Sequence, residues 1–490
     1  MKTEDLGMRK KSMKENAILN ALRTLAGIVF PLITYPYISR VLGADNLGKI
    51  NFANSIVSYF SLLAALGISS YAIREGGAIR DDKNKLKNFS NQIFTINMVF
   101  TAISYILLAI LLSFSKRLYA YKELIIIQSF IIFATTIGIE WLFSIYEDYA
   151  YITVRTIAIQ FIALCAMFLC VRKEDDYLRY ALISVLASGG GYIVNYFYSH
   201  KYFSVRLTKK VEWTKHLKPM LILFFNTLAI TIYVNSDITI LGILKGDYYV
   251  GIYSVSVKIY TILKQIVNAL LVSSLPRLSY YVATDRKDNY QDLLNKILRA
   301  LLLVLMPMVA GIIMLSPDIV VLVSGKAFEQ SYASLQILSV AIAFSLIAAF
   351  FSSGVLLPNK KDRKILTATI ISAIVNLSLN FILIPVCNEK GAALTTVLAE
   401  VTVMGIGMYY SKDIFKISNV RKTVMEGCIG IAGIVILCKI VNANINSMIL
   451  RLSLAIFVSV IYYVVVLWGF KEELFMDVIN VIKQKVKREK

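Results

Sequence analysis

The stretch NLSLNFILIPVCNEKGAALTTVLAE, residues 376–400, decides the fold of this chain. It begins with an apolar run in which Asn376 and Asn380 lie four residues apart, and therefore on one face of a helix. We expect Pro385 to end this helix, because proline lacks the N–H group that would continue it. The residues CNEK then form a turn before a second apolar run begins. The sequence therefore predicts two antiparallel helices joined by a short turn.

Small residues recur every four positions in the second run, at Gly391, Thr395 and Ala399, and this pattern lets two membrane helices approach closely. Glu400 follows this row about 14 Å from the turn at ~1.5 Å per residue, and Asn376 lies at a similar depth on the first helix. A carboxylate in hydrocarbon is costly without a polar partner, so we expect an asparagine amide beside Glu400. The simplest interpretation is a helix-packing hairpin with a satisfied polar pair.

These two runs resemble the late hairpin of the bacterial polysaccharide flippases, the Wzx-like branch of the MOP transporter superfamily. The likeness rests on NLxLNxxLIP, a short turn and GAAxxTxxAE. The turn departs from the family pattern, which often has a glycine where this chain has residues 387–390. Near the amino end, PLITYPYISRVLGADNLGKINFANS, residues 31–55, resembles the family's first hairpin. The resemblance extends over residues of roughly 15 to 420.

The composition by itself indicates a polytopic membrane protein, because 57% of the residues are hydrophobic and only 17% are charged. The chain has five cysteines and two histidines, without a CxxC motif or a histidine cluster, so we expect neither a metal site nor a disulfide framework. It has no GxxxxGK loop, so we do not expect it to hydrolyse ATP.

Apolar segments of helix length predict an all-α fold with about fourteen transmembrane helices, two six-helix lobes and an extra carboxyl-terminal helix pair. By resemblance this architecture is MATE/MOP-like. Lysines and arginines gather at both ends of the chain and in alternate loops, which predicts that both termini are cytoplasmic. This topology accounts for the formal net charge of +21, so nucleic-acid binding is not expected and the carboxyl-terminal tail is expected to rest on anionic lipid. The predicted parts are a cytoplasmic tail (1–16), an amino-terminal lobe (17–200), a cytoplasmic linker (201–218), a carboxyl-terminal lobe (219–411), the extra helix pair (412–470) and a basic cytoplasmic tail (471–490).

A weak internal repeat supports the two lobes. VLGADNLGKINFANS after the first span corresponds to ILKGDYYVGIYSVSV after the seventh. Each copy has a short outer turn with an aspartate, Asp45 or Asp247, and a glycine that opens the next helix, Gly48 or Gly251. Because six spans separate the copies, the lobes run in the same sense and are expected to face each other across a central cavity.

Cations within the spans are the main candidates for function, since they are costly unless they face a cavity or a partner. Arg23, Lys258 and Lys264 are expected to line the cavity as substrate-binding cations. For Arg23 the alternative is that its side chain reaches the cytoplasmic surface. Asp237 lies at the depth of Lys258, and the two form either a functional pair or a buried salt bridge.

Carboxylates and amides within the spans are candidates for ion coupling or for structural pairs: Asp237, Glu400, Asn376 and Asn380. A coupling proton or sodium ion is the only cofactor that we consider. Three further charges have simpler interpretations. Glu140 and Arg155 lie near the inner ends of consecutive spans and are expected to pair locally, and Arg299 is expected to anchor a span end at the surface.

The resemblance implies a flippase that moves undecaprenyl-pyrophosphate-linked oligosaccharide across the bacterial cytoplasmic membrane by alternating access. Its implied partners are this substrate, membrane lipids, and the polysaccharide polymerase and glycosyltransferases of the same pathway. The extra helix pair is associated with a lipid-tail groove in related flippases. Two other transport functions stay open, a multidrug or cation antiporter of the same superfamily and a peptidoglycan lipid-intermediate flippase. A membrane polymerase or ligase is disfavoured, because the outer loops are short and hold no histidine.

Overall fold

The computed structural model describes residues 13–418, 420–477 and 479–480. Within these ranges the chain is helical and holds no strand. It divides into two compact units, Met1–Gly251 and Ile252–Lys490. Most of the predicted tail 1–16, and the last ten residues of the predicted tail 471–490, lie outside the described residues.

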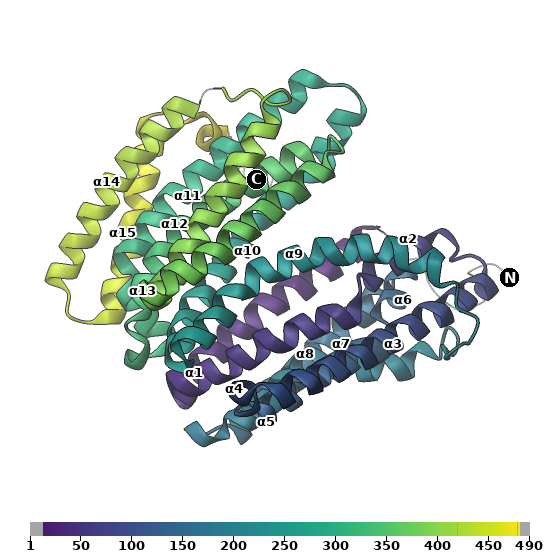
Figure 1. Cartoon of the computed structure of the whole chain (residues 1–490). Helices are drawn as coiled ribbons and strands as arrows, with labels where there is room; N and C mark the ends of the chain where they lie inside the picture. The colour runs from purple at the N-terminus through teal and green to yellow at the C-terminus, as the bar shows by residue number, and fades with distance from the viewer. Residues whose placement is uncertain (1–12, 419, 478, 481–490) are drawn as a thin grey trace, which may run out of the picture. The chain divides into compact units, whose positions relative to one another are not determined.

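The long helices of the first unit pack around α1 (Figure 1). α1 contacts α3, α5, α7 and α9, and α8 packs between α5 and α7. The helices are α1 (Met13–Ala65), α2 (Ile68–Ala78), α3 (Lys83–Phe114), α4 (Lys116–Tyr119), α5 (Lys122–Gly138), α6 (Glu140–Ile145), α7 (Tyr149–Cys170), α8 (Tyr177–Ser199) and α9 (Trp213–Lys245).

In the second unit, α11 packs against α12, α14 and α15, and α12 packs against α13. The first residues of α10 belong to the first unit and the rest belong to the second. The helices are α10 (Asp247–Ala283), α11 (Lys287–Ser324), α12 (Ser331–Ala349), α13 (Asp362–Ser411), α14 (Val420–Asn444) and α15 (Met448–Gly469).

The structure confirms an all-helical, polytopic membrane fold. In the part of the chain that the structure describes, ten helices are long and apolar enough to cross a membrane. Two of these helical stretches are broken in the middle, α1 at Gly43 and α13 at Asn388. The expected number of fourteen spans and the cytoplasmic location of both termini stay predictions.

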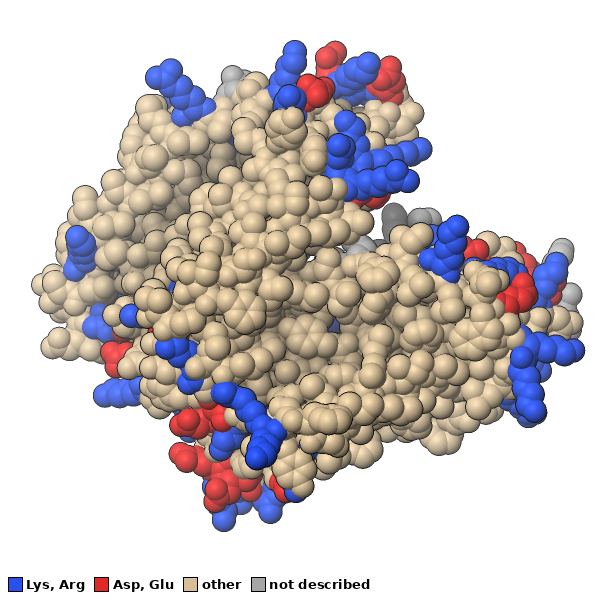
Figure 2. Space-filling model, in the orientation of Figure 1, with Lys and Arg blue, Asp and Glu red and all other residues tan. Residues whose placement is uncertain are grey.

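The outer surface of each unit, taken by itself, fits a lipid environment. Figure 2 shows charged side chains gathered towards the ends of the long helices, with a wide uncharged surface between them. Large apolar side chains are exposed on these helices, including Phe161 at 64%, Phe225 at 60% and Phe457 at 64%. In water such exposure would be costly, whereas in a bilayer it is the favoured arrangement.

The two copies of the internal repeat are in contact inside the first unit. Gly43 and Gly246 both have a positive φ, 73° and 93°, which breaks the chain just before Gly48 and Gly251. A Cβ atom at Gly48 would overlap the carbonyl group of Asp247, and one at Gly251 would overlap the carbonyl group of Ala44. The two copies of the repeat therefore make the same glycine-to-carbonyl contact in both directions, and a side chain at either glycine would displace the backbone opposite.

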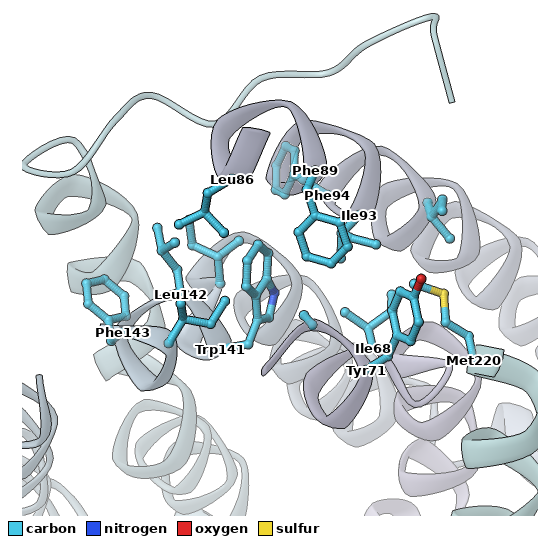
Figure 3. Packing of buried hydrophobic residues seen from close by; sticks show 14 of the residues in the cluster. Ile68, Tyr71, Leu86, Phe89, Ile93, Phe94, Trp141, Leu142, Phe143 and Met220 are labelled. Atoms are coloured by element: carbon cyan, nitrogen blue, oxygen red, sulfur yellow. The ribbon is translucent and has the colours of Figure 1, made fainter. Parts of the chain in front are cut away.

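One end of the first unit is held together by a hydrophobic cluster, whose side chains come from α2, α3, α6 and α9 and point towards one another (Figure 3). Tyr71 and Trp141 are among its members. Beside the cluster, Asp82 caps α3 by accepting the backbone N–H groups of Lys85 and Asn84. These hydrogen bonds hold the pKa of the Asp82 carboxyl below its usual value, and the bond from the Lys85 N–H has the largest effect.

The hairpin at 376–400 forms as predicted, with one correction. Ser372 Oγ donates to the carbonyl of Ala399, and a Cβ at Gly391 would overlap the carbonyl of Leu383, so the two runs are antiparallel and in close contact. The helix does not end at Pro385 but continues to Asn388, where φ is 51°. A proline removes only one N–H donor, so it can stand in a last helical turn, and asparagine tolerates positive φ better than most residues.

The predicted lobes 17–200 and 219–411 stay a prediction. Within the first unit, α9 packs against α1 and α2. Polar side chains line the contact between α9 and α1, where Asn235 donates to Ser58 at 3.1 Å and Thr239 donates to Ser55 at 3.0 Å. The first helix after the predicted linker thus lies in the same compact unit as the helices before it.

Candidate functional site

Two arginines share one glutamate in the first unit. Arg23 Nη2 donates to Glu140 Oε1 at 2.7 Å, and Arg155 Nη2 donates to Glu140 Oε2 at 3.0 Å. The expected local pair of Glu140 and Arg155 is confirmed, and Arg23 joins it from α1. Arg155 is 8% exposed, Glu140 20% and Arg23 33%. With two cations and one carboxylate, this group carries a net charge of +1.

Local backbone features build this triad. Ile139 has φ 35°, so the chain breaks between α5 and α6 and Glu140 becomes the first residue of a new helix. On α8, a Cβ at Gly191 would approach Arg155 Nε to 2.8 Å, so the absence of a side chain leaves room for the guanidinium. Arg155 also lies over the ring of Tyr192 at 5.7 Å, a cation–π contact that holds it in place.

Two hollows adjoin the triad. A cavity of about 170 Å³ is lined by Glu140 and Tyr192 together with small polar side chains, Asn97, Thr135, Thr136, Ser69 and Ser144 among them. A groove of about 600 Å³ is lined by Arg155, Tyr151, Tyr198 and Asp148 with apolar residues of α7 and α8. Water-sized space bordered by polar side chains therefore lies next to both Glu140 and Arg155.

A second ion pair lies in the second unit, between α10 and α13. Lys264 Nζ donates to Glu400 Oε1 at 2.8 Å, and Tyr260 donates its hydroxyl to the same oxygen at 2.9 Å. Lys264 Nζ also contacts the Tyr260 hydroxyl at 3.1 Å. We expected an asparagine amide beside Glu400, and the groups that contact Oε1 are instead a lysine and a tyrosine from another helix. Glu400 is 5% exposed and Lys264 33%, so the carboxylate is buried whereas the cation is partly exposed.

The two asparagines of the hairpin form a polar row inside the second unit. Asn380 Nδ2 donates to Asn376 Oδ1 at 3.2 Å, and Thr395 Oγ1 donates to Asn380 Oδ1 at 2.6 Å. All three side chains are buried. The four-residue spacing that placed the asparagines on one face is thus confirmed, and Thr395 of the small-residue row completes the set.

Asp237 and Lys258 lie in different units, on α9 and α10, so their expected pairing stays a prediction. Asp237 is buried, at 5% exposure, and Lys258 is partly buried. Lys258 and Lys264 lie six residues apart on one helix and therefore point in different directions.

Arg299 corrects the prediction of a surface anchor. Its side chain is 9% exposed and donates to Glu472 at 2.6 Å and to Glu473 at 2.8 Å. These acids follow α15, more than 170 residues away in sequence. The position of Arg299 along its helix predicted that it lies near a helix end, but it did not predict its partners, because the segment after α15 folds back onto α11.

The chain matches a family described as "Polysaccharide biosynthesis protein" over residues 13–282. It is 23% identical over 418 residues to a protein of Escherichia coli (strain K12) named "Putative O-antigen transporter", covering 83% of this chain and 99% of that protein. A protein of the same name from Shigella dysenteriae is 22% identical over 397 residues, covering 80% and 98%.

Solved structures share the fold. The lipid II flippase MurJ in an inward closed conformation superposes with a TM-score of 0.74 at 14% identity, covering 95% of this chain and 99% of MurJ. An inward-facing multidrug resistance MATE transporter of the MOP superfamily superposes with a TM-score of 0.59 at 13% identity, covering 80% and 94%. At such identities the likeness establishes the fold alone.

Proposed function

We propose, since this chain belongs to the polysaccharide biosynthesis protein family, that it is a flippase for lipid-linked oligosaccharide. Its cargo would be the undecaprenyl-pyrophosphate-linked repeat unit of a cell-surface polysaccharide, and its place the bacterial cytoplasmic membrane. The observation that carries this proposal is that the two relatives named for O-antigen transport match this chain over nearly their whole length. The pathway's polymerase and glycosyltransferases would be its partners.

The intramembrane cations suit such a cargo. A pyrophosphate needs positive charge along its path, the sugars need polar groups, and the polyprenyl tail can stay in lipid. Each partly exposed cation, Arg23 and Lys264, is held by a carboxylate through one contact and remains one-third exposed. The carboxylate reduces the free-energy cost of burying the cation and holds the cation in position. The remaining N–H groups of the cation can donate to phosphate oxygens. Lys258 would act with them.

Transport would proceed by alternating access, in which rocking of the two lobes exposes the cavity first to the inside and then to the outside. Ion coupling is a separate part of the proposal. Glu400 and Asp237 are the carboxylates that could take up a proton, and the oxygens of Asn376 and Asn380 could take part in holding a sodium ion. Support for the second option is the buried row of amide and hydroxyl oxygens that ends at Thr395.

The charge balance favours an anionic cargo over a cationic one. The triad of Arg23, Glu140 and Arg155 has a net charge of +1, and the Lys264–Glu400 pair is neutral. An antiporter of organic cations would be expected to present unpaired carboxylates instead. The MATE-like fold alone does not favour that alternative, since fold and cargo vary independently. The peptidoglycan lipid intermediate shares the pyrophosphate and stays an alternative cargo.

Reconstituted protein tests the proposal. Proteoliposomes would be loaded with fluorescent undecaprenyl-pyrophosphate oligosaccharide, and flipping would be measured as loss of label to an external quencher. We expect protein-dependent flipping, which the single charge reversals Arg23→Glu, Lys258→Glu and Lys264→Glu each abolish. The matched control is Lys412→Glu, an exposed lysine at the end of α13 that should not matter.

Two results would contradict different parts of the proposal. Normal flipping by all three reversals would refute the cation site while leaving the cargo in place. No flipping by the intact chain, with transport of a cationic dye under a proton or sodium gradient, would assign the chain to the antiporters.

A further inference from the structure

A group of acidic residues surrounds Arg299 where α11, α14 and the segment after α15 meet. Arg299 uses all three guanidinium nitrogens: Nη2 on Glu472 at 2.6 Å, Nη1 on Glu473 at 2.8 Å and Nε on Thr423 at 3.2 Å. Glu472 is 1% exposed and its second oxygen accepts the backbone N–H of Phe475 at 3.0 Å. The hydrogen-bonding groups of Arg299 are therefore satisfied by Thr423 and the two glutamates.

Glu426 belongs to the same group but has no such partners. Its side chain is 0% exposed, and neither carboxyl oxygen has a hydrogen bond within the described part of the chain. Within the described residues its ion pair is with Lys422 one helical turn earlier, with Nζ 3.7 Å from Oε1 and the lysine 52% exposed. That distance is too long for a hydrogen bond, and the ammonium can turn to water instead.

The neighbouring charges do not favour a third carboxylate. The charged and titratable groups that face Glu426 are Lys422 on its own helix, Arg299 on α11, Tyr463 on α15 and Glu472 after α15. Arg299 already has two acidic partners, and the hydroxyl of Tyr463 donates to the carbonyl of Leu303. Buried acids that lack hydrogen bonds and face like charges give up their charge by binding a proton.

From this geometry we infer that Glu426 is a proton-binding site and carries a proton in this conformation. The site lies in the extra helix pair and goes beyond the proposed flipping of lipid-linked sugars. Its ligand is the proton alone, which the carboxylate binds to become a neutral carboxyl group.

Loss of the proton would disturb the contact between α14 and α11. Next to Glu426, a Cβ at Gly427 would overlap the side chain of Met306 on α11, so the two helices are in close contact there. An ionised Glu426 must reach water by moving α14 away, draw the ammonium of Lys422 inward from water, or draw Arg299 from Glu472 and Glu473. In each case the side-chain contacts of the extra pair change with one proton.

Infrared spectroscopy of the full chain in lipid nanodiscs tests this inference. At neutral pH we expect the carbonyl band of a protonated carboxyl in the native protein. Glu426→Gln should remove the contribution of this residue to the band, because the amide replaces the neutral acid. The matched control Glu473→Gln removes an exposed acid of the same group and should leave the band in place.

Hydrogen exchange provides a second readout. In the native protein, raising the pH should reduce the protection of the backbone amides of residues 422–428 by more than the intrinsic pH dependence of hydrogen exchange. In Glu426→Gln the protection should not show this additional loss. A band of unchanged intensity in Glu426→Gln would overturn the inference. If this variant does not fold, the native protein with isotope-labelled glutamate still decides: absence of any protonated glutamate at neutral pH would also overturn it.

Discussion

Breaking the Lys264–Glu400 pair from either side should have unequal costs, because the two residues are unequally buried. Lys264→Met leaves the Glu400 carboxylate, which is 5% exposed, with only the Tyr260 hydroxyl. Removing one partner of a buried pair costs roughly 3–5 kcal/mol, and we expect about 3 kcal/mol here because the tyrosine remains. Glu400→Gln leaves an ammonium that is 33% exposed and can reach water, so we expect only about 1 kcal/mol.

The double variant tests whether these costs have a common cause. Lys264→Met with Glu400→Gln leaves no unpaired charge, so its cost should be about 2 kcal/mol and the interaction energy about 2 kcal/mol. The assay is equilibrium unfolding of the reconstituted protein by a denaturing detergent. Equal single costs, or a double variant that is additive within about 0.5 kcal/mol, would refute the reasoning.

Transport by the same variants separates structure from function. If Lys264 binds the cargo, the double variant regains stability but does not transport. If Lys264 only neutralises Glu400, the double variant regains both, and Lys264 no longer belongs to the proposed site.

Three further predictions concern the first unit. Glu140→Gln leaves two arginines side by side and should cost about 3 kcal/mol in detergent unfolding, whereas Glu75→Gln, in an exposed pair, should cost less than about 1 kcal/mol. Gly251→Ala forces a Cβ into a carbonyl group and should lower stability by about 2 kcal/mol, whereas Gly405→Ala, with nothing within 4 Å, should raise it slightly. The Asp82 cap has a lowered pKa in the folded chain, so it should stabilise α3 fully at pH values above the ordinary aspartate pKa. This stabilisation should be lost as the pH falls through the lower pKa of the folded state. Hydrogen exchange at the start of α3 should show this pH dependence, and Asp82→Ala should remove it.

Local patterns in the sequence predicted much of the fold. The apolar runs predicted the helices, and the row of Gly391, Thr395 and Ala399 predicted a close hairpin, because spacing along a helix determines which side chains share a face. The repeat at Gly48 and Gly251 pointed to two equivalent turns, although not to the contact between them.

Partners across long sequence separations could not be predicted in the same way. Arg23 and Glu140 are 117 residues apart, and Lys264 and Glu400 are 136 apart. Position along a span gives the depth of a charge in the membrane, but which helices are neighbours depends on packing that a single sequence does not contain. The local pair of Glu140 and Arg155 was accessible because consecutive helices joined by a short loop are adjacent.

The sidedness of the lipid-linked oligosaccharide in cells tests the central claim most directly, because it needs no knowledge of the sugar. Sealed membranes would be prepared from source cells with and without this chain. The amount of undecaprenyl-pyrophosphate oligosaccharide that an added lectin or oxidant can reach would then be measured for each face of the membrane. We predict that cells without the chain accumulate the oligosaccharide on the cytoplasmic face and that restoring the chain moves it to the outer face. An unchanged distribution between the faces would contradict a flippase.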